Sequence, residues 1–156
     1  MKSTIEDLLV IRFFVPGIAR TAGSKSAFKD KWGKTHLTHA GKYTKGWMDR
    51  VSWFALKEYG ERRVILTCPI ALKLTFFRKR PDGDYRTGRY AGILKPSASK
   101  YPTPKPDLTK LTRAAEDAIT GIVWKDDSQV VKQETEKVYC GPEDKIGVYI
   151  TIERVL

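Results

Sequence analysis

Alternating apolar and polar residues predict where this chain forms half-buried strands. A period of two places successive side chains on opposite faces of a sheet. It occurs in residues 69–80 and again in residues 145–155, with apolar positions at Ile70, Leu72, Leu74, Phe76, Ile146, Val148, Ile150 and Ile152. Two further apolar segments, Leu8 to Val15 and Val130 to Cys140, are predicted as strands. Between the last two strands, "CGPEDK" has the residue types of a hairpin turn.

Apolar positions three and four residues apart predict two helices. The first lies in "YTKGWMDRVSWFALKEYG", residues 43–60, and Gly60 is a plausible end for it. Its apolar stripe is formed by Trp47, Val51, Phe54 and Ala55. The second helix follows Pro106 and Asp107, and its stripe is formed by Leu108, Leu111, Ala115, Ala118, Ile119 and Ile122. Trp53 and Leu56 lie off the first stripe, so they either contact a partner subunit or are scattered exposed apolar residues.

These elements predict one α+β domain over residues 1–156, in which a small mixed β-sheet packs with two main helices. Residues 19–34 are rich in glycine and lysine, and we expect a loop or short hairpin without core residues. No apolar run approaches the roughly 20 residues that span a bilayer, and no secretory signal is recognisable, so we expect a cytoplasmic protein. Cys68 and Cys140 are expected to be reduced core thiols rather than a disulfide.

The charge balance indicates a polyanionic partner. The chain has 29 Lys and Arg against 18 Asp and Glu, a formal net charge of +11. This favours nucleic acid ahead of a membrane surface, although a basic protein that is merely soluble is the alternative. Cations with interleaved tyrosines concentrate between residues 78 and 106, which suits phosphates and unstacked bases but is also compatible with a solvated flexible loop. The candidate DNA-binding residues are Arg78, Lys79, Arg80, Arg86, Arg89, Lys95, Lys100, Lys105, Lys110 and Arg113.

Carboxylates stand at both ends of the segment that holds the second helix. Asp107 precedes the helix, whereas Asp126 and Asp127 follow it. Along the polar face, Thr109, Arg113 and Asp117 recur at four-residue intervals. A purely structural interpretation makes Asp107 a helix cap, Arg113 and Asp117 a surface ion pair, and the later acids a turn. The functional interpretation is a Mg²⁺ or Mn²⁺ site for phosphodiester chemistry, because hard cations prefer oxygen ligands and bind substrate phosphates.

At these residues the chain resembles the RusA family of Holliday junction resolvases. The matching residues are Pro106-Asp107-Leu108, Leu111, Arg113-Ala114, Asp117-Ala118, Gly121 and "DDSQVV" from Asp126 to Val131. A weaker resemblance extends over nearly the whole chain. It implies an endonuclease that cuts four-way DNA junctions as a homodimer, often encoded by a phage or prophage. It also implies a metal site built from Asp107, an acid two residues later and Asp127, with a basic side chain on the next helical turn.

Two positions depart from the family pattern. The usual "PDLDN" is "PDLTK" here, so Thr109 occupies a metal-ligand position and Lys110 follows it. Arg113 stands where the family has a lysine. The positive charge is kept, but it is carried by a planar guanidinium instead of a compact ammonium group. Thr109 offers only a neutral oxygen, so metal binding should weaken unless Thr109 binds through water or Asp117 joins the site.

The predicted function is a metal-dependent, structure-specific endonuclease for four-way and related branched DNA. The candidate catalytic residues are Asp107, Arg113 and Asp127, and the candidate metal ligands are Asp107, Thr109, Asp117, Asp126 and Asp127. A non-catalytic junction- or single-strand-binding protein with a degraded metal site is the alternative. We expect no nucleotide cofactor, because the glycine-lysine loops do not complete a phosphate-binding loop. A zinc site at His36 and His39 is disfavoured, since the cysteines lack paired spacing.

Overall fold

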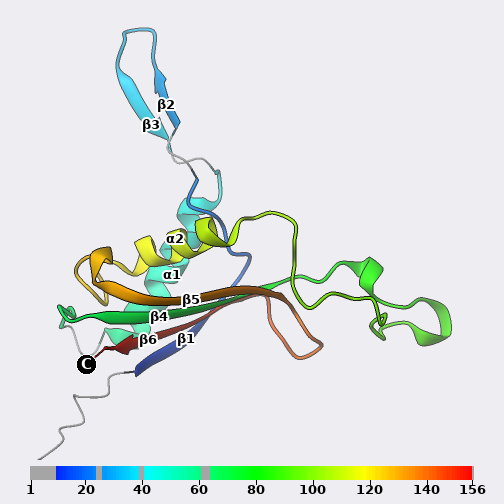
Figure 1. Cartoon of the computed structure of the whole chain (residues 1–156). Helices are drawn as coiled ribbons and strands as arrows, with labels where there is room; N and C mark the ends of the chain where they lie inside the picture. The colour runs from blue at the N-terminus through cyan, green and yellow to red at the C-terminus, as the bar shows by residue number, and fades with distance from the viewer. Residues whose placement is uncertain (1–9, 24–25, 39–40, 61–63, 156) are drawn as a thin grey trace, which may run out of the picture.

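Four strands form one mixed sheet, and a two-stranded hairpin stands apart from it (Figure 1). The computed structural model describes residues 10–23, 26–38, 41–60 and 64–155. The strands are β1 (Val10–Pro16), β2 (Ser26–Lys29), β3 (Thr35–Thr38), β4 (Ile70–Arg78), β5 (Val130–Tyr139) and β6 (Gly147–Arg154). The helices are α1 (Thr44–Tyr59) and α2 (Leu108–Ile119), with short 3-10 turns η2 (Asp82–Asp84), η3 (Gly88–Tyr90) and η4 (Asp127–Gln129). The α+β fold class is therefore confirmed.

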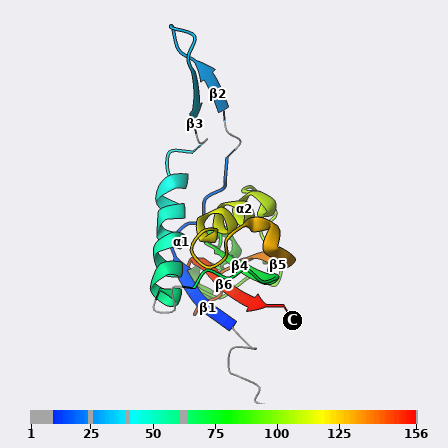
Figure 2. The ribbon, with the colours of Figure 1, turned by 90° about the vertical axis from the view of Figure 1, so that its left-hand side faces the viewer.

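The core lies between the sheet and the two helices, which cover the same face (Figure 2). Helix α1 packs against β1, α2 packs against β5, and the helices contact each other. The predicted alternation is confirmed, because Val15, Leu74 and Ile150 are fully buried on the helix side. On the opposite face, Lys73 and Tyr149 are exposed. One side of the sheet is thus open to solvent, as a small antiparallel or mixed sheet allows.

The predicted hairpin between the last two strands is wrong. The sheet order is β1-β6-β4-β5, so β4 separates β5 from β6. β5 pairs parallel with β4, whereas β6 pairs antiparallel with both β4 and β1. A parallel pair needs a long crossover, and the chain through α2 supplies it. Residues 140–146 do contain a turn, in which the Gly141 N–H donates to Asp144 Oδ2 at 2.7 Å, but the chain then passes to the far side of β4.

Both predicted helices are confirmed, with small differences in burial. Trp47, Val51 and Ala55 are buried on α1, and Phe54 is partly buried. The α2 stripe is confirmed from Leu108 to Ile119, whereas its predicted member Ile122 is partly buried in the turn after the helix. Thr112 and Ala114 are also buried because α2 packs against α1 and β5 at once. Ala19 belongs to the core, so the expectation that residues 19–34 contribute none is wrong at that position.

Three further predictions concern the first strand, the two cysteines and membrane-spanning segments. The first strand begins at Val10, and the predicted strand residues Leu8 and Leu9 lie outside the described residues. Both cysteines are free, Cys140 buried and Cys68 partly so. No helix in the described part of the chain has the length and apolar character needed to cross a membrane.

Candidate active site and nucleic-acid interface

The turn between α2 and β5 holds Asp126 and Asp127 in different roles. Asp126 is the N-cap of η4, and its carboxylate accepts from the Ser128 N–H at 2.9 Å. This bonding with Ser128 holds the pKa of Asp126 below its ordinary value. The Gln129 side chain accepts from the N–H groups of Lys125 and Asp126, and it donates to Leu66 O and Cys68 O. Asp126 therefore has a structural role.

Asp127, which follows the N-cap residue Asp126, lines a cavity between α2 and β5. The cavity has a volume of about 390 Å³ and is lined by Thr109, Thr112, Arg113, Glu116, Asp117, Asp127, Gln133 and Thr135. The α2 members share one face because they recur three and four residues apart. Three predicted site residues of α2 and Asp127 thus meet in one cavity, whereas Asp107 and Asp126 are not among the lining residues.

Glu116 is a site residue that the sequence did not reveal. It is partly buried, and Gln133 Nε2 donates to its Oε2 at 3.3 Å. Burial raises the pKa of Glu116, the Gln133 hydrogen bond opposes this, and the nearby carboxylates of Asp127 and Asp117 raise it further. The only signal in the sequence is that Glu116 lies seven residues after Thr109, on the same helical face. Negative charge is therefore concentrated at the Asp127 end of the cavity.

Three further polar residues in or next to α2, Arg113, Asp107 and Thr112, differ in their contacts. Arg113 Nε lies 3.9 Å from Asp117 Oδ2, which confirms the predicted ion pair. Asp107 occupies the N-cap position of α2, but its side chain makes no capping hydrogen bond, so its interpretation as a side-chain cap is wrong. Its carboxylate instead lies 3.3 Å from Lys110 Nζ. Thr112 is 4% exposed and its hydroxyl has no hydrogen-bond partner among the described residues.

The donor chemistry of this cavity fits a hard divalent cation. Its lining offers carboxylate, amide and hydroxyl oxygens and no sulfur or imidazole ligand. Within the ranges that the structure describes, however, His, Cys, Asp and Glu side chains form no group of three or more that could hold a metal ion. Mg²⁺ usually keeps several waters and takes further oxygens from substrate phosphate, so one or two carboxylates are enough.

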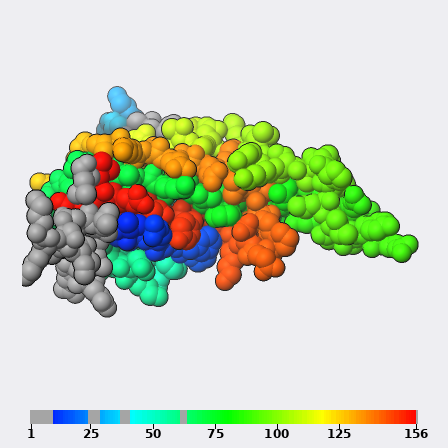
Figure 3. Space-filling view, turned by 60° about the horizontal axis from the view of Figure 1, so that its bottom comes forward, coloured from blue at the N-terminus to red at the C-terminus, as the bar shows by residue number. Residues whose placement is uncertain are grey.

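The basic segment forms an arm, defined here as residues 79–105, that extends beyond the end of the sheet (Figure 3). Its outer part is a narrow loop held by backbone hydrogen bonds. The Arg86 N–H donates to Ile93 O and the Lys95 N–H donates to Asp84 O, both at 2.8 Å. Lys95 Nζ also donates to Gly83 O at 2.7 Å. Hydrogen bonds between residues 83–86 and residues 93–95 thus give the arm a defined path.

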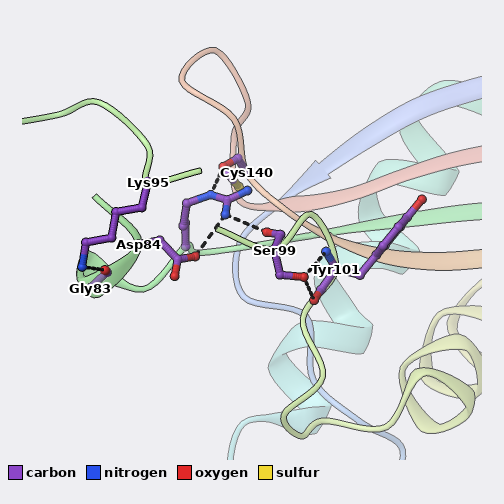
Figure 4. A network of polar contacts seen from close by, with 7 residues as sticks. Gly83, Asp84, Lys95, Ser99, Tyr101 and Cys140 are labelled. Carbon is purple, nitrogen blue, oxygen red and sulfur yellow. Dashed lines mark hydrogen bonds and ion pairs between the residues drawn. The ribbon is translucent and has the colours of Figure 1, made fainter. Parts of the chain in front are cut away.

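Arg80 connects the arm to the sheet through hydrogen bonds to Asp84, Ser99 and Cys140, which are labelled in Figure 4. Its side chain is 8% exposed, and Nη1 donates to Asp84 Oδ2 at 3.0 Å and to Ser99 O at 2.7 Å. Its Nε donates to Cys140 O at 3.3 Å, at the end of β5. The predicted DNA-binding residue Arg80 is therefore buried at the base of the arm, where its Nε and Nη1 donate to protein oxygens.

The remaining cations of the arm are better placed for contact with a polyanion. Lys79, Arg86, Arg89, Lys95, Lys100 and Lys105 are exposed. Arg78, at the end of β4, is partly buried, and burial lowers its pKa. Aromatic rings accompany these cations: Arg86 and Arg89 each lie 5.9 Å from the Tyr90 ring centre, and Lys100 lies 5.1 Å from that of Tyr101. Such cation–aromatic pairs are suited to both phosphates and base faces.

The acid-lined cavity and the basic arm belong to one strongly basic α+β domain. The chain belongs to the RusA family, because the family model described as "Endodeoxyribonuclease RusA" matches residues 19–153. The match includes α2, η4, β5 and the arm, and so covers all of the cavity described above. The chain is also similar to YqaN of Bacillus subtilis (strain 168), which is described as an uncharacterized protein. The two are 29% identical over 121 residues, which is 76% of this chain and 80% of YqaN.

Proposed function

We propose that this protein is a metal-dependent endonuclease that cleaves four-way and related branched DNA junctions by phosphodiester hydrolysis. Membership of the RusA family supports endodeoxyribonuclease activity. The observation that carries the finer proposal is the cavity in which Asp127 and Glu116 lie beside Arg113. It combines anionic oxygens for a divalent cation with a cation for a phosphate. We further propose that the enzyme acts in the cytoplasm, where a phage or prophage genome would meet it.

The proposed roles of the residues follow from their surroundings. Asp127 and Glu116 would hold Mg²⁺ or Mn²⁺, and the chemistry supplied by such an ion is Lewis-acid stabilisation of the phosphate and activation of water. Gln133 fixes one oxygen of Glu116, so this carboxylate keeps one orientation. Asp117 keeps the Arg113 guanidinium at the cavity, where it can contact phosphate oxygens as negative charge develops on them. Asp107 does not line the cavity and its carboxylate pairs with Lys110, so it would have to leave Lys110 to serve as a further ligand when DNA is bound.

The arm is proposed to hold the DNA backbone. Its exposed cations Arg86, Arg89, Lys95 and Lys100 would neutralise phosphates, and each neutralised phosphate releases counterions. Lys105 ends the arm and Lys110 follows the cavity residue Thr109 in the first turn of α2, so cations continue along the chain from the arm to the cavity. This continuity supports a single path for a DNA strand from the arm to the cavity.

A homodimer is proposed because a four-way junction has approximate two-fold symmetry and requires two opposed cuts. Apolar residues on and near α1 offer a surface for it: Trp53, Leu56 and Ile65 are 55%, 57% and 44% exposed. Leu56 and Ile65 line a hollow of about 740 Å³ together with Tyr59 and Ile122. Exposed apolar residues gathered at one hollow suit burial against a second copy better than isolated ones do. The mass in solution tests this proposal.

The test of the catalytic proposal is Asp127→Asn, which removes the charge and keeps the shape of the side chain. We expect the variant to bind a synthetic four-way junction as tightly as the wild type, or more tightly because repulsion from phosphate is lost, and to lose nicking in Mg²⁺. Asp49→Asn is a matched control, since Asp49 is an exposed carboxylate on α1 that pairs only with Lys45 in the part of the chain described. Cleavage by Asp127→Asn at near wild-type rate would rule out the assigned role.

A second candidate function is junction binding without catalysis. Thr109, which lines the cavity in place of the acid typical of the family, favours it. Under this alternative the wild-type protein binds junctions with high salt sensitivity but leaves the strands intact at every concentration of Mg²⁺ or Mn²⁺.

A further inference from the structure

The tip of the β2–β3 hairpin is an organised turn that presents a tryptophan to solvent. The strands pair Lys29 with Thr35, so residues 30–34 form the turn. The Asp30 carboxylate accepts from the N–H groups of Trp32 and Lys34, both at 2.9 Å. His36 Nε2 lies 2.8 Å from the other oxygen of Asp30, and this bond is the main reason that the pKa of Asp30 is lowered.

The turn leaves Trp32 with little protein to pack against. Gly33 has φ of +79°, a conformation that glycine adopts without strain and that sharply reverses the chain next to Trp32. Trp32 is 79% exposed, the highest value among the exposed large hydrophobic residues of the described ranges. Lys31 Nζ lies 4.4 Å from its ring centre. A fixed turn therefore holds a large flat apolar ring in water, which is costly unless the ring has a partner.

The chain that precedes the hairpin is bonded to the helix that lines the cavity. The Ala22 N–H donates to Lys110 O at 3.0 Å, in the first turn of α2, and Thr44 Oγ1 donates to Thr21 O at 3.0 Å. Each strand has four residues, so the tip is raised by about 13 Å. The hairpin stands away from the sheet in both ribbon views (Figures 1 and 2). The chain that leads into the hairpin is therefore fixed at the N-terminal end of α2, the helix that lines the cavity.

The charges around the hairpin identify the partner as a polyanion with flat apolar faces. Lys29, Lys31 and Lys34 surround the tip and are exposed. At the base, Tyr43 is 59% exposed and lies 5.1 Å from the Arg20 guanidinium carbon and 5.6 Å from Lys42 Nζ. Cations next to exposed aromatic rings match phosphates next to bases. An apolar protein surface would suit Trp32 but not the lysines around it.

We propose that Trp32 stacks on an unstacked base at the branch point of a DNA junction, while Lys29, Lys31 and Lys34 contact the flanking phosphates. The proposal rests on the proposed function, since it takes branched DNA as the substrate. Bases at a branch point can leave the stack at low cost, whereas bases within a continuous duplex are stacked on both sides. Trp32 is therefore a residue that distinguishes a junction from a linear duplex, and the lysines around it contribute affinity for both.

The experiment measures binding of the full chain in EDTA, so that cleavage does not intervene. The probes are a four-way junction with 2-aminopurine at the branch point and a linear duplex that carries 2-aminopurine in the same sequence. The variants are Trp32→Ala and Trp32→Phe, and Tyr149→Ala is the matched control because Tyr149 is an exposed aromatic residue on the open face of the sheet. Trp32 makes no core contact, so circular dichroism should show that its variants are folded.

We expect Trp32→Ala to bind the junction about ten-fold more weakly than the wild type and the duplex equally well. The slope of log affinity against log salt should stay unchanged, because no charge is removed. The 2-aminopurine fluorescence change seen with the wild type should disappear in Trp32→Ala and persist in Trp32→Phe and Tyr149→Ala.

Three results would overturn the inference. Trp32→Ala could bind the junction like the wild type with the same fluorescence change, or it could lose affinity equally for junction and duplex. It could also change the mass in solution, which would assign Trp32 to a contact between protein copies. A wild-type protein without preference for the junction over the duplex would instead overturn the proposed function, and this inference with it. Lack of cleavage alone leaves the binding test intact.

Discussion

Replacing Arg80 by methionine should release the arm while leaving the sheet folded. The guanidinium makes three hydrogen bonds, to Asp84 Oδ2, Ser99 O and Cys140 O. Methionine keeps the apolar length of the side chain but can donate to none of them. Residues 80–84 and Ser99 would then lose the guanidinium that joins them to each other and to Cys140, and the Tyr139 N–H bond to Lys100 O would remain as a link between the arm and β5.

The expected loss of unfolding free energy in Arg80→Met follows from the burial of the Arg80–Asp84 ion pair. Removing one partner of a buried ion pair costs about 3–5 kcal/mol. The Arg80 side chain is 8% exposed and that of Asp84 is 25% exposed. Because Asp84 can regain water, we expect the lower end, about 3 kcal/mol. Arg12→Met is the control, since Arg12 and Glu153 are 57% and 48% exposed and 3.9 Å apart, and such a surface pair contributes less than about 1 kcal/mol.

Amide hydrogen exchange is the direct assay, combined with denaturant unfolding. In Arg80→Met, the amides of Arg86 and Lys95, which are bonded across the arm, should exchange faster, while those of β4 and β6 keep their protection. Affinity for DNA should fall although Arg80 itself is buried. Unchanged exchange in the arm, or a loss of protection spread evenly over the sheet, would refute the assignment of Arg80 as the anchor of the arm.

The remaining predictions concern the arm and the cavity. Lys100→Gln should flatten the slope of log affinity against log salt by about one unit, and an unchanged slope would show that Lys100 does not contact phosphate. Thr109→Asp should lower the Mg²⁺ concentration for half-maximal nicking because it adds an anionic oxygen ligand. The same half-maximal Mg²⁺ concentration in variant and wild type would contradict this. If Asp117 already supplies that charge, Asp117→Asn should abolish nicking and Thr109→Asp should partly restore it. Glu116→Gln should stabilise the metal-free protein at neutral pH and have little effect in acid. The reason is that the pKa of Glu116 is raised in the folded state, so wild-type stability falls as pH rises through that pKa. Equal denaturation midpoints of the two proteins at neutral pH would refute this interpretation.

The sequence was a good guide to elements and a weaker guide to their pairing. Period-two and period-three-to-four patterns located the strands and helices, because burial on one face dictates apolar spacing. The hairpin prediction failed because nearness in the chain does not decide pairing: α2 carries the chain over the sheet and sets β5 beside β4. Nothing in "CGPEDK" reports that a third strand lies between its neighbours.

The residues of the candidate site also differ in how far the sequence alone indicates their roles. Asp126 followed three residues later by Gln129 is a local capping pattern, so its structural role was in principle readable. Glu116 depends on Gln133 from another element, and Arg80 looks like any other cation of the arm until burial is known. Residues whose roles arise from distant segments are the ones that the sequence could not assign.

The most direct test of the central claim is cleavage of a synthetic four-way junction by the wild-type protein in Mg²⁺, with each strand labelled in turn. We expect nicks at symmetry-related positions in two opposed strands, none in EDTA, and little cleavage of the linear duplex of the same sequence. Tight junction binding with all four strands intact in both Mg²⁺ and Mn²⁺ would contradict it and would favour the non-catalytic binding protein.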